Sequence, residues 1–229
     1  MVYKPLLDLL LPTACLHCNR PAEADGLCQD CRALLIPNRP CCPRCAEPLP
    51  PQAPADRPCG QCSRKPPPFE RLVAPWLYRP PLDGWIRDLK LSARLPAGRV
   101  LGRLLAGALT MEEPPELLVP IPRHPDALRR HGFNHAAEIT RALADALALP
   151  WRANLLTKVR ATDSQATLDR ARRLANLRGA FHFDNPGRWR RVAVVDDVST
   201  TTATARAAAA ALRRAGVAQV VVWTVARTP

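Results

Sequence analysis

The chain has 229 residues and a net charge of +13, because 33 lysines and arginines outnumber 20 aspartates and glutamates. Hydrophobic residues make up 47% of it, which is enough for the core of one α/β domain plus a small appendage. No stretch approaches the ~18 apolar residues of a membrane helix, which argues against a membrane-spanning protein, and the charge favours acidic partners such as phosphorylated metabolites or nucleic acid.

The N-terminal segment, Met1 to Ala14, has one lysine and a short apolar run that ends just before Cys15. This run is too short and too weakly basic for a good signal peptide. Cys15 also belongs to a longer cysteine pattern. We therefore expect a cytoplasmic protein.

The nine cysteines all lie between residues 15 and 62, and eight of them form four C-x-x-C pairs. Each pair can present two thiolates to one metal ion, and two pairs complete a tetrahedral Cys₄ zinc site. The spacing predicts two structural Zn²⁺ sites, one made by Cys15, Cys18, Cys28 and Cys31 and the other by Cys42, Cys45, Cys59 and Cys62. A cross-braced arrangement is also compatible with the spacing, and disulfides are the alternative in an oxidising compartment.

Three prolines, Pro66 to Pro68, predict a stiff extended linker after the last cysteine, because their φ angles are fixed. We therefore expect a zinc-ribbon-like module at residues 1–68 and a second domain at residues 69–229. The module is too short and too proline-rich to bury much apolar area, so metal would supply most of its folding free energy.

In the second domain, apolar strands alternate with helices. We expect an edge strand at 71–78, further strands at 117–122, 154–158, 192–195 and 219–225, and helices at 82–91, 100–109, 136–149 and 203–215. This alternation predicts an α/β domain with a mostly parallel sheet, and such sheets bind ligands at the carboxyl ends of their strands. Residues 122–124 and 196–204 both follow strands, so we expect them to meet in space.

The stretch from Arg191 to Thr204 is the most informative part of this domain. A short apolar strand ends in Asp196 and Asp197, a run of hydroxyl residues follows, and an alanine-rich helix comes next. Backbone N–H groups at the helix start can hold a phosphate. The carboxylates can accept hydrogen bonds from ribose hydroxyls, directly or through a divalent metal. The alternative is an ordinary strand-to-helix turn with a Ser/Thr N-cap.

This stretch resembles the phosphoribosyl-pyrophosphate (PRPP) signature of type I phosphoribosyltransferases, in which two acids precede a Thr/Ser/Gly loop. The matching residues are Asp196, Asp197, Thr200, Thr201, Ala203 and Thr204. Thr202 stands where the signature has a glycine, and glycine is the residue that readily adopts positive φ.

Nearly the whole chain resembles the ComF family, whose GntX-type members are linked to competence and to the use of DNA as a nutrient. The resemblance rests on the order and spacing of the four cysteine pairs and of short motifs: Pro66-Pro-Pro-Phe69, Leu89-Lys-Leu91, Val119-Pro-Ile-Pro122, Arg130-His-Gly-Phe-Asn134, Ser164-Gln165, Asn176-Leu-Arg-Gly-Ala-Phe181 and the acidic-pair loop. It implies an N-terminal zinc-ribbon-like module on a type I phosphoribosyltransferase domain. His135 is a departure, because family members have Gln at that position.

The resemblance implies transfer of a 5-phosphoribosyl group from PRPP, with pyrophosphate as the leaving group. It assigns the acidic pair, Asp196 and Asp197, to the ribose hydroxyls and Mg²⁺. The 5′-phosphate would bind to Ser199, Thr200, Thr201, Thr202, Ala203 and Thr204. Arg123 and His124 would face pyrophosphate, and a hood carrying Lys158, Arg160 and Gln165 would close over it. His124, His131 and His135 otherwise fit surface or packing positions.

A second class of function fits the same composition. The zinc module and the arginine-rich surface could bind single-stranded DNA, with a PRPP site that no longer catalyses a reaction. Docking of the zinc module to competence or DNA-processing proteins is a further alternative. The acceptor of a phosphoribosyl group has no recognisable code in the sequence.

Overall fold

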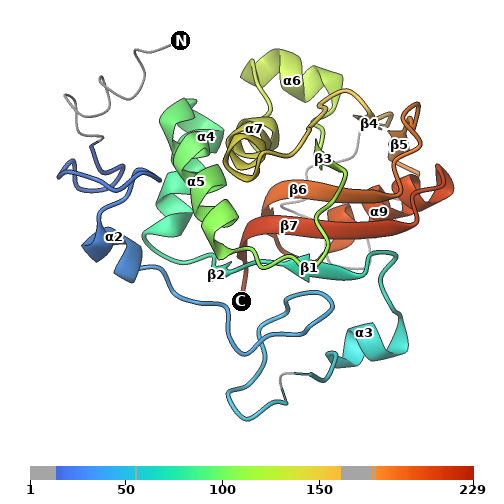
Figure 1. Cartoon of the computed structure of the whole chain (residues 1–229), viewed down its shortest axis with the longest axis horizontal. Coiled ribbons are helices and arrows are strands. Elements are labelled where there is room, and N and C mark those ends of the chain that lie inside the picture. Colours follow the sequence, from blue (N-terminus) through green and yellow to red (C-terminus); the bar gives the residue numbers. More distant parts are fainter. Residues whose placement is uncertain (1–13, 55, 161–176, 178) are drawn as a thin grey trace.

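The computed structural model of the chain describes residues 14–54, 56–160, 177 and 179–229. Its centre is a parallel sheet of β1 (Arg71–Val73), β2 (Trp76–Leu77), β3 (Leu117–Pro120), β6 (Arg191–Ser199) and β7 (Gln219–Arg227). The strand order is β1-β7-β6-β3, with β2 also beside β7, and every pair is parallel (Figure 1). The predicted α/β class with a mostly parallel sheet is therefore confirmed.

The sheet is covered by helices on both faces. Side chains alternate along β6, so Val192 and Val194 pack toward α9 (Ala203–Arg214), while Ala193 and Val195 pack toward the opposite layer. That layer consists of α4 (Leu82–Ser92), α5 (Leu95–Ala108) and α7 (His135–Leu147) (Figure 1). Burial on both faces explains why β6 starts as a continuous apolar run rather than an alternating one.

Several elements differ from the prediction. The edge strand expected at 71–78 is divided into β1 and β2. The strand expected at 154–158 is β4 (Leu156–Lys158), but it pairs antiparallel with β5 (Phe181–Phe183) in a separate two-stranded sheet. The basic stretch after β3 contains a short helix, α6 (Pro125–His131), that the sequence pattern did not indicate. Of the expected hood, Gln165 lies outside the described residues, whereas Lys158 and Arg160 are described. Among those that are described, no helix has the length and apolarity to cross a bilayer.

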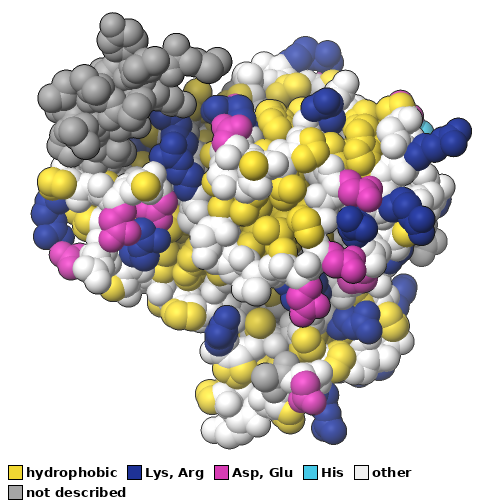
Figure 2. Space-filling view, in the orientation of Figure 1, with side chains coloured by type: hydrophobic (Ala, Val, Ile, Leu, Met, Phe, Trp, Pro, Cys, Tyr) yellow, Lys and Arg dark blue, Asp and Glu magenta, His cyan; other side chains and the backbone are white. Residues whose placement is uncertain are grey.

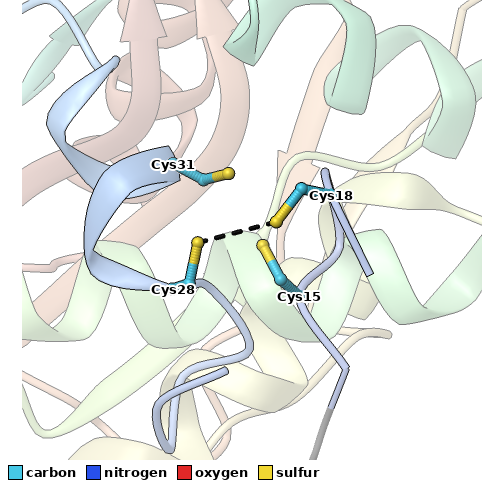
Figure 3. Close-up of side chains that lie close together, drawn as sticks. All are labelled: Cys15, Cys18, Cys28 and Cys31. Carbon is cyan, nitrogen blue, oxygen red and sulfur yellow. Dashed lines mark hydrogen bonds between the residues drawn. The ribbon is translucent and has the colours of Figure 1, made fainter. Parts of the chain in front are cut away.

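The eight paired cysteines form two separate clusters of four. Cys15, Cys18, Cys28 and Cys31 converge in one cluster (Figure 3), and Cys42, Cys45, Cys59 and Cys62 form the other. Two sulfur–sulfur distances, Cys18 to Cys28 and Cys45 to Cys59, are both 3.7 Å. Four sulfurs bound at about 2.3 Å to a tetrahedral zinc lie about 3.8 Å apart. The donor sets therefore fit two structural zinc ions, and the cross-braced arrangement is wrong.

Disulfides do not account for this geometry. All nine cysteines have free thiols, and the 3.7 Å separations far exceed a sulfur–sulfur bond of about 2.05 Å. We call the segment with Cys15, Cys18, Cys28 and Cys31 the first ribbon and the segment with Cys42, Cys45, Cys59 and Cys62 the second ribbon. In each ribbon the second C-x-x-C pair spans the start of a short helix, α2 (Gln29–Ala33) in the first and α3 (Gly60–Arg64) in the second. Each helix begins directly after the first cysteine of its pair, so the local backbone turns both thiols toward the same point.

Both ribbons share apolar contacts with the rest of the chain. Leu16, Leu27 and Leu35 of the first ribbon pack in the same buried cluster as Trp85 and Leu101. In the second ribbon, Ala46 belongs to the buried cluster under α9. The chain between the second ribbon and β1 is also hydrogen-bonded to α9, so the two parts are held together; the domain boundary at residue 68 stays a prediction.

The close approach of α5 and α7 generates a stability prediction. A Cβ atom on Gly102 would lie 2.5 Å from the carbonyl oxygen of Ile139 and 2.7 Å from Cβ of Ala142. Gly102→Ala is therefore expected to lower the free energy of unfolding by about 1–3 kcal/mol, because the helices must separate. Gly107 in the same helix has open space around it, so Gly107→Ala is expected to raise stability by about 0.5–1 kcal/mol. Urea unfolding measures both, and equal effects would contradict the packing described here.

The cysteine clusters generate a metal prediction. The purified protein is expected to contain two zinc ions per chain, and Cys45→Ser is expected to retain one and to melt at a lower temperature. Cys41→Ser is the matched control, because Cys41 neighbours Cys42 but belongs to neither cluster. Elemental analysis by mass spectrometry gives the stoichiometry. Loss of zinc in the Cys41 variant, or full zinc content in the Cys45 variant, would be inconsistent with these ligand sets.

Candidate functional site

A cavity of about 920 Å³ opens at the carboxyl ends of β3, β6 and β7. The turn after β3 and the loop after β6 both form part of its wall, and the starts of α7 and α9 also line it. Residues 122–124 and 196–204 therefore lie around one cavity, as expected from their places after parallel strands.

Asp197 is the buried charge at the centre of the site. It is 3% exposed, and its two oxygens have different partners. Lys90 Nζ lies 2.9 Å from Oδ1, and His135 Nε2 lies 2.6 Å from Oδ2. Burial opposes ionisation of Asp197, but the charges and hydrogen bonds of His135 and Lys90 outweigh it and hold its pKa well below the usual range.

Asp196 differs from its neighbour in environment. It is half-buried and lines the cavity, and its Oδ1 accepts a 2.9 Å hydrogen bond from the backbone N–H of Asp197. Burial, together with the charge of Asp197, raises the pKa of Asp196 to about 7. The two carboxylates are therefore unequal: Asp197 is ionised and already paired, and Asp196 faces the cavity.

The partners of Asp197 come from helices far away in the sequence. Asn134 caps α7, since its Oδ1 accepts from the N–H of Ala136, and its Nδ2 donates to the carbonyl of Ile121 just after β3. This cap fixes the first turn of α7 beside β3 and brings His135 to the cavity. Lys90 reaches the same point from the last turn of α4. Although burial opposes its charge, the carboxylate of Asp197 raises the pKa of Lys90.

Sequence reasoning gave neither Lys90 nor His135 a role. Lys90 belongs to a Leu-Lys-Leu motif, but it is one of several charged residues in α4, so its position alone is a weak signal. His135 departs from the family pattern but stands beside the N-cap of a helix. Only the packing of α4 and α7 on the sheet shows that both side chains reach Asp197.

The hydroxyl loop, residues 199–202, links β6 to α9. Ser199 is 6% exposed, and its Oγ has no hydrogen-bond partner among the described residues. Thr202, the residue before α9, has φ of +59°, in the left-handed region. The chain therefore takes here the backbone conformation that glycine provides in the PRPP signature, although a β-branched residue adopts it at a cost of about 1–3 kcal/mol.

Basic residues from the turn after β3 and from β4 also line the cavity. Nη1 of Arg123 is buried without a hydrogen-bond partner among the described residues, and burial lowers the pKa of Arg123 against the attraction of Asp197. Lys158 also lines the cavity, and burial lowers its pKa. His124 lines the cavity too, but its Nδ1 caps α6 by accepting from the N–H of Asp126. Arg160 is exposed beyond β4 and is not part of the cavity wall.

Comparison with known proteins adds to this geometry. Residues 6–63 match the double zinc ribbon domain family. The DNA utilization protein YhgH of Escherichia coli is 34% identical over 228 residues, which cover 96% of this chain and 99% of that protein. The protein of the same name from Salmonella typhimurium is also 34% identical over 228 residues. Competence protein F of Haemophilus influenzae is 32% identical over 224 residues, which cover 93% of this chain and 96% of that protein.

These identities extend over both zinc ribbons and the α/β part, and they agree with the ComF resemblance of the motifs. The chain therefore belongs to the family of DNA utilization protein YhgH and competence protein F, in which it combines a double zinc ribbon with a largely parallel α/β sheet.

Proposed function

We propose that the cavity binds PRPP. The observation that carries this proposal is that two buried donors, Ser199 Oγ and Arg123 Nη1, have no partner among the described residues, and both residues line the cavity together with the acidic pair. Buried polar groups are normally satisfied, so a ligand with acceptor oxygens at both ends would complete the site. PRPP has a phosphate at one end, a diphosphate at the other and ribose hydroxyls between them.

The 5′-phosphate would lie at the hydroxyl loop and the start of α9. This helix has 12 residues, and its first backbone N–H groups carry a partial positive charge that favours an anion. The hydroxyls of Ser199, Thr200, Thr201 and Thr204 also line the cavity and can donate to phosphate oxygens. The positive φ of Thr202 directs the chain into the helix at this point.

The ribose hydroxyls would bind to Asp196. Both oxygens of Asp197 are already in contact with Lys90 and His135, so Asp197 is poorly placed to accept further donors or to bind a metal. One cavity-facing carboxylate is a weak Mg²⁺ site, because Mg²⁺ requires about six oxygen ligands. The residues therefore fit Mg²⁺ that arrives with the ligand's own oxygens. When bound, Mg²⁺ would neutralise part of the diphosphate charge.

The diphosphate would face Arg123 and Lys158, with His124 beside them. In a transfer reaction the bond between ribose C1 and the diphosphate oxygen breaks, and negative charge develops on the leaving group. Basic side chains held at that place stabilise the charge without having to reorganise.

Binding of single-stranded DNA is the second candidate, supported by the net charge of +13 and by the names of the relatives, a DNA utilization protein and a competence protein. On the face shown in Figure 2, however, the coloured lysines and arginines are scattered and lie among acidic side chains. A strand-binding groove has basic residues along a track with aromatic side chains for stacking. The face shown in Figure 2 therefore offers no such track.

Calorimetric titration of Mg²⁺ and PRPP into the zinc-loaded chain tests the proposal. Binding is expected, and Asp196→Asn is expected to weaken it by at least about tenfold, since a ribose-binding carboxylate is lost. The variant should be no less stable than the parent, because burial opposes the charge that it removes. Asp145→Asn, at an exposed position of α7, should bind as the parent does. If the parent protein gives no heat of PRPP binding and instead binds single-stranded DNA in a salt-dependent way, the PRPP proposal is wrong and the second candidate is favoured.

Replacement of Thr202 tests the loop itself. Thr202→Gly relieves the strain of a positive φ and clears the approach to the backbone, so the Kd for PRPP should fall by about three- to tenfold. Ala148→Gly is the matched control, because Ala148 also has a positive φ, at the end of α7. The control should gain stability with no change in Kd. An unchanged Kd in the Thr202 variant would exclude close backbone contact at this position.

A further inference from the structure

A buried arginine is hydrogen-bonded to the backbone of the hydroxyl loop. Arg227, at the end of β7, is 1% exposed, and its guanidinium donates to the carbonyl oxygens of Ser199, at 3.0 Å, and Thr200. A buried guanidinium is costly unless it is paired. The pairing group is the carboxylate of Glu47, which contacts Nη2 of Arg227.

Glu47 belongs to the second zinc ribbon. Its carbonyl oxygen accepts a 2.8 Å hydrogen bond from the N–H of Cys42, so its backbone is part of the turn that carries Cys42 and Cys45. Two of the four ligands of the second cluster thus fix the position of Glu47. The carboxylate that neutralises Arg227 therefore depends on the fold of a metal site.

A second arginine connects the segment just after α3 to Thr202, the last residue of the loop. Arg206, in the first turn of α9, donates to the carbonyl of Lys65 at 3.1 Å and to that of Pro66 at 3.4 Å. Its Nε lies 3.4 Å from Oγ1 of Thr202. Lys65 directly follows α3, which carries Cys62. Arg227 and Arg206 therefore connect the second ribbon to the hydroxyl loop, the first at Ser199–Thr200 and the second at Thr202.

The first ribbon has no comparable role among the described residues. Its backbone accepts from Arg94 at Leu16 and from Arg103 at Ala24, and both arginines lie on the α4–α5 side of the sheet. The loss of zinc from the first cluster would therefore disturb a different layer of the molecule.

We propose that the second zinc ribbon positions the hydroxyl loop, and that Glu47 and Arg227 are the positioning residues that connect them. Zinc at the second cluster and a ligand at the loop are then thermodynamically linked, so each raises the retention of the other. The ligand part of this proposal rests on the proposed PRPP function, whereas the connection between ribbon and loop does not.

Hydrogen exchange of the ligand-free protein tests the connection. In Glu47→Gln, amides of residues 199–204 are expected to exchange at least about fivefold faster, while both zinc ions are retained. Glu23→Gln is the matched control, because Glu23 pairs with Arg32 in the first ribbon. The control should leave loop exchange unchanged. If Glu47→Gln does not fold, Arg206→Met removes the other contact and should have the same local effect. Loop exchange equal to that of the parent in a folded, zinc-loaded variant would overturn the proposal.

Alkylation of the cysteines, followed by peptide mass spectrometry, tests the linkage. With Mg²⁺ and PRPP present, Cys42, Cys45, Cys59 and Cys62 should react more slowly, and the four cysteines of the first cluster should not change. Equal protection of both clusters would contradict the linkage. If PRPP binds by calorimetry without protecting the second cluster, the linkage is also wrong. If PRPP does not bind but Glu47→Gln still loosens the loop, the connection stands and the proposed ligand falls.

Discussion

The carboxylate of Asp197 is buried at the end of β6, and the site depends on how its charge is neutralised. Lys90 approaches from α4 and His135 from α7, so one carboxylate joins two helices to the central strand. Removal of one partner of a buried ion pair costs about 3–5 kcal/mol, because the other charge stays buried. This contact therefore fixes the position of both helices around the cavity. It also separates the roles of the two acids, since it leaves Asp196 to face a ligand.

The second zinc ribbon is connected to the site through one arginine. Arg227 donates to the backbone of the hydroxyl loop, and its charge is neutralised by Glu47 from the second ribbon. The two buried ion pairs thus act on the same loop: one holds the strand that enters it, and the other includes the arginine that is hydrogen-bonded to its carbonyl groups. A family that places a double zinc ribbon before an α/β sheet would, in this arrangement, use metal to shape a ligand site.

The sequence predicts the local features of this structure well. Cysteine spacing identifies the ligands of both zinc clusters, because each C-x-x-C pair is a short-range pattern. Which two pairs share a metal ion is shown only by the structure. Apolar runs identify β6 and β7, whose burial on both faces leaves little ambiguity. By contrast, Lys90, His135 and Arg227 act through contacts with residues that are tens of positions or more away. A lone charged residue carries no sign of its partner, so such contacts are not visible in one sequence. A threonine at the glycine position of the signature indicates a conflict between residue type and backbone conformation at residue 202, and the structure shows a positive φ there.

A crystal structure of the zinc-loaded chain with Mg²⁺ and PRPP would show whether PRPP binds at the hydroxyl loop and Asp196. The 5′-phosphate is expected at the backbone N–H groups of residues 200–204, and the ribose hydroxyls are expected on Asp196. Asp197 should remain in contact with Lys90 and His135, and Arg227 with Glu47. Density for PRPP elsewhere, or an Asp197 that leaves both partners to bind the ribose, would contradict this binding mode.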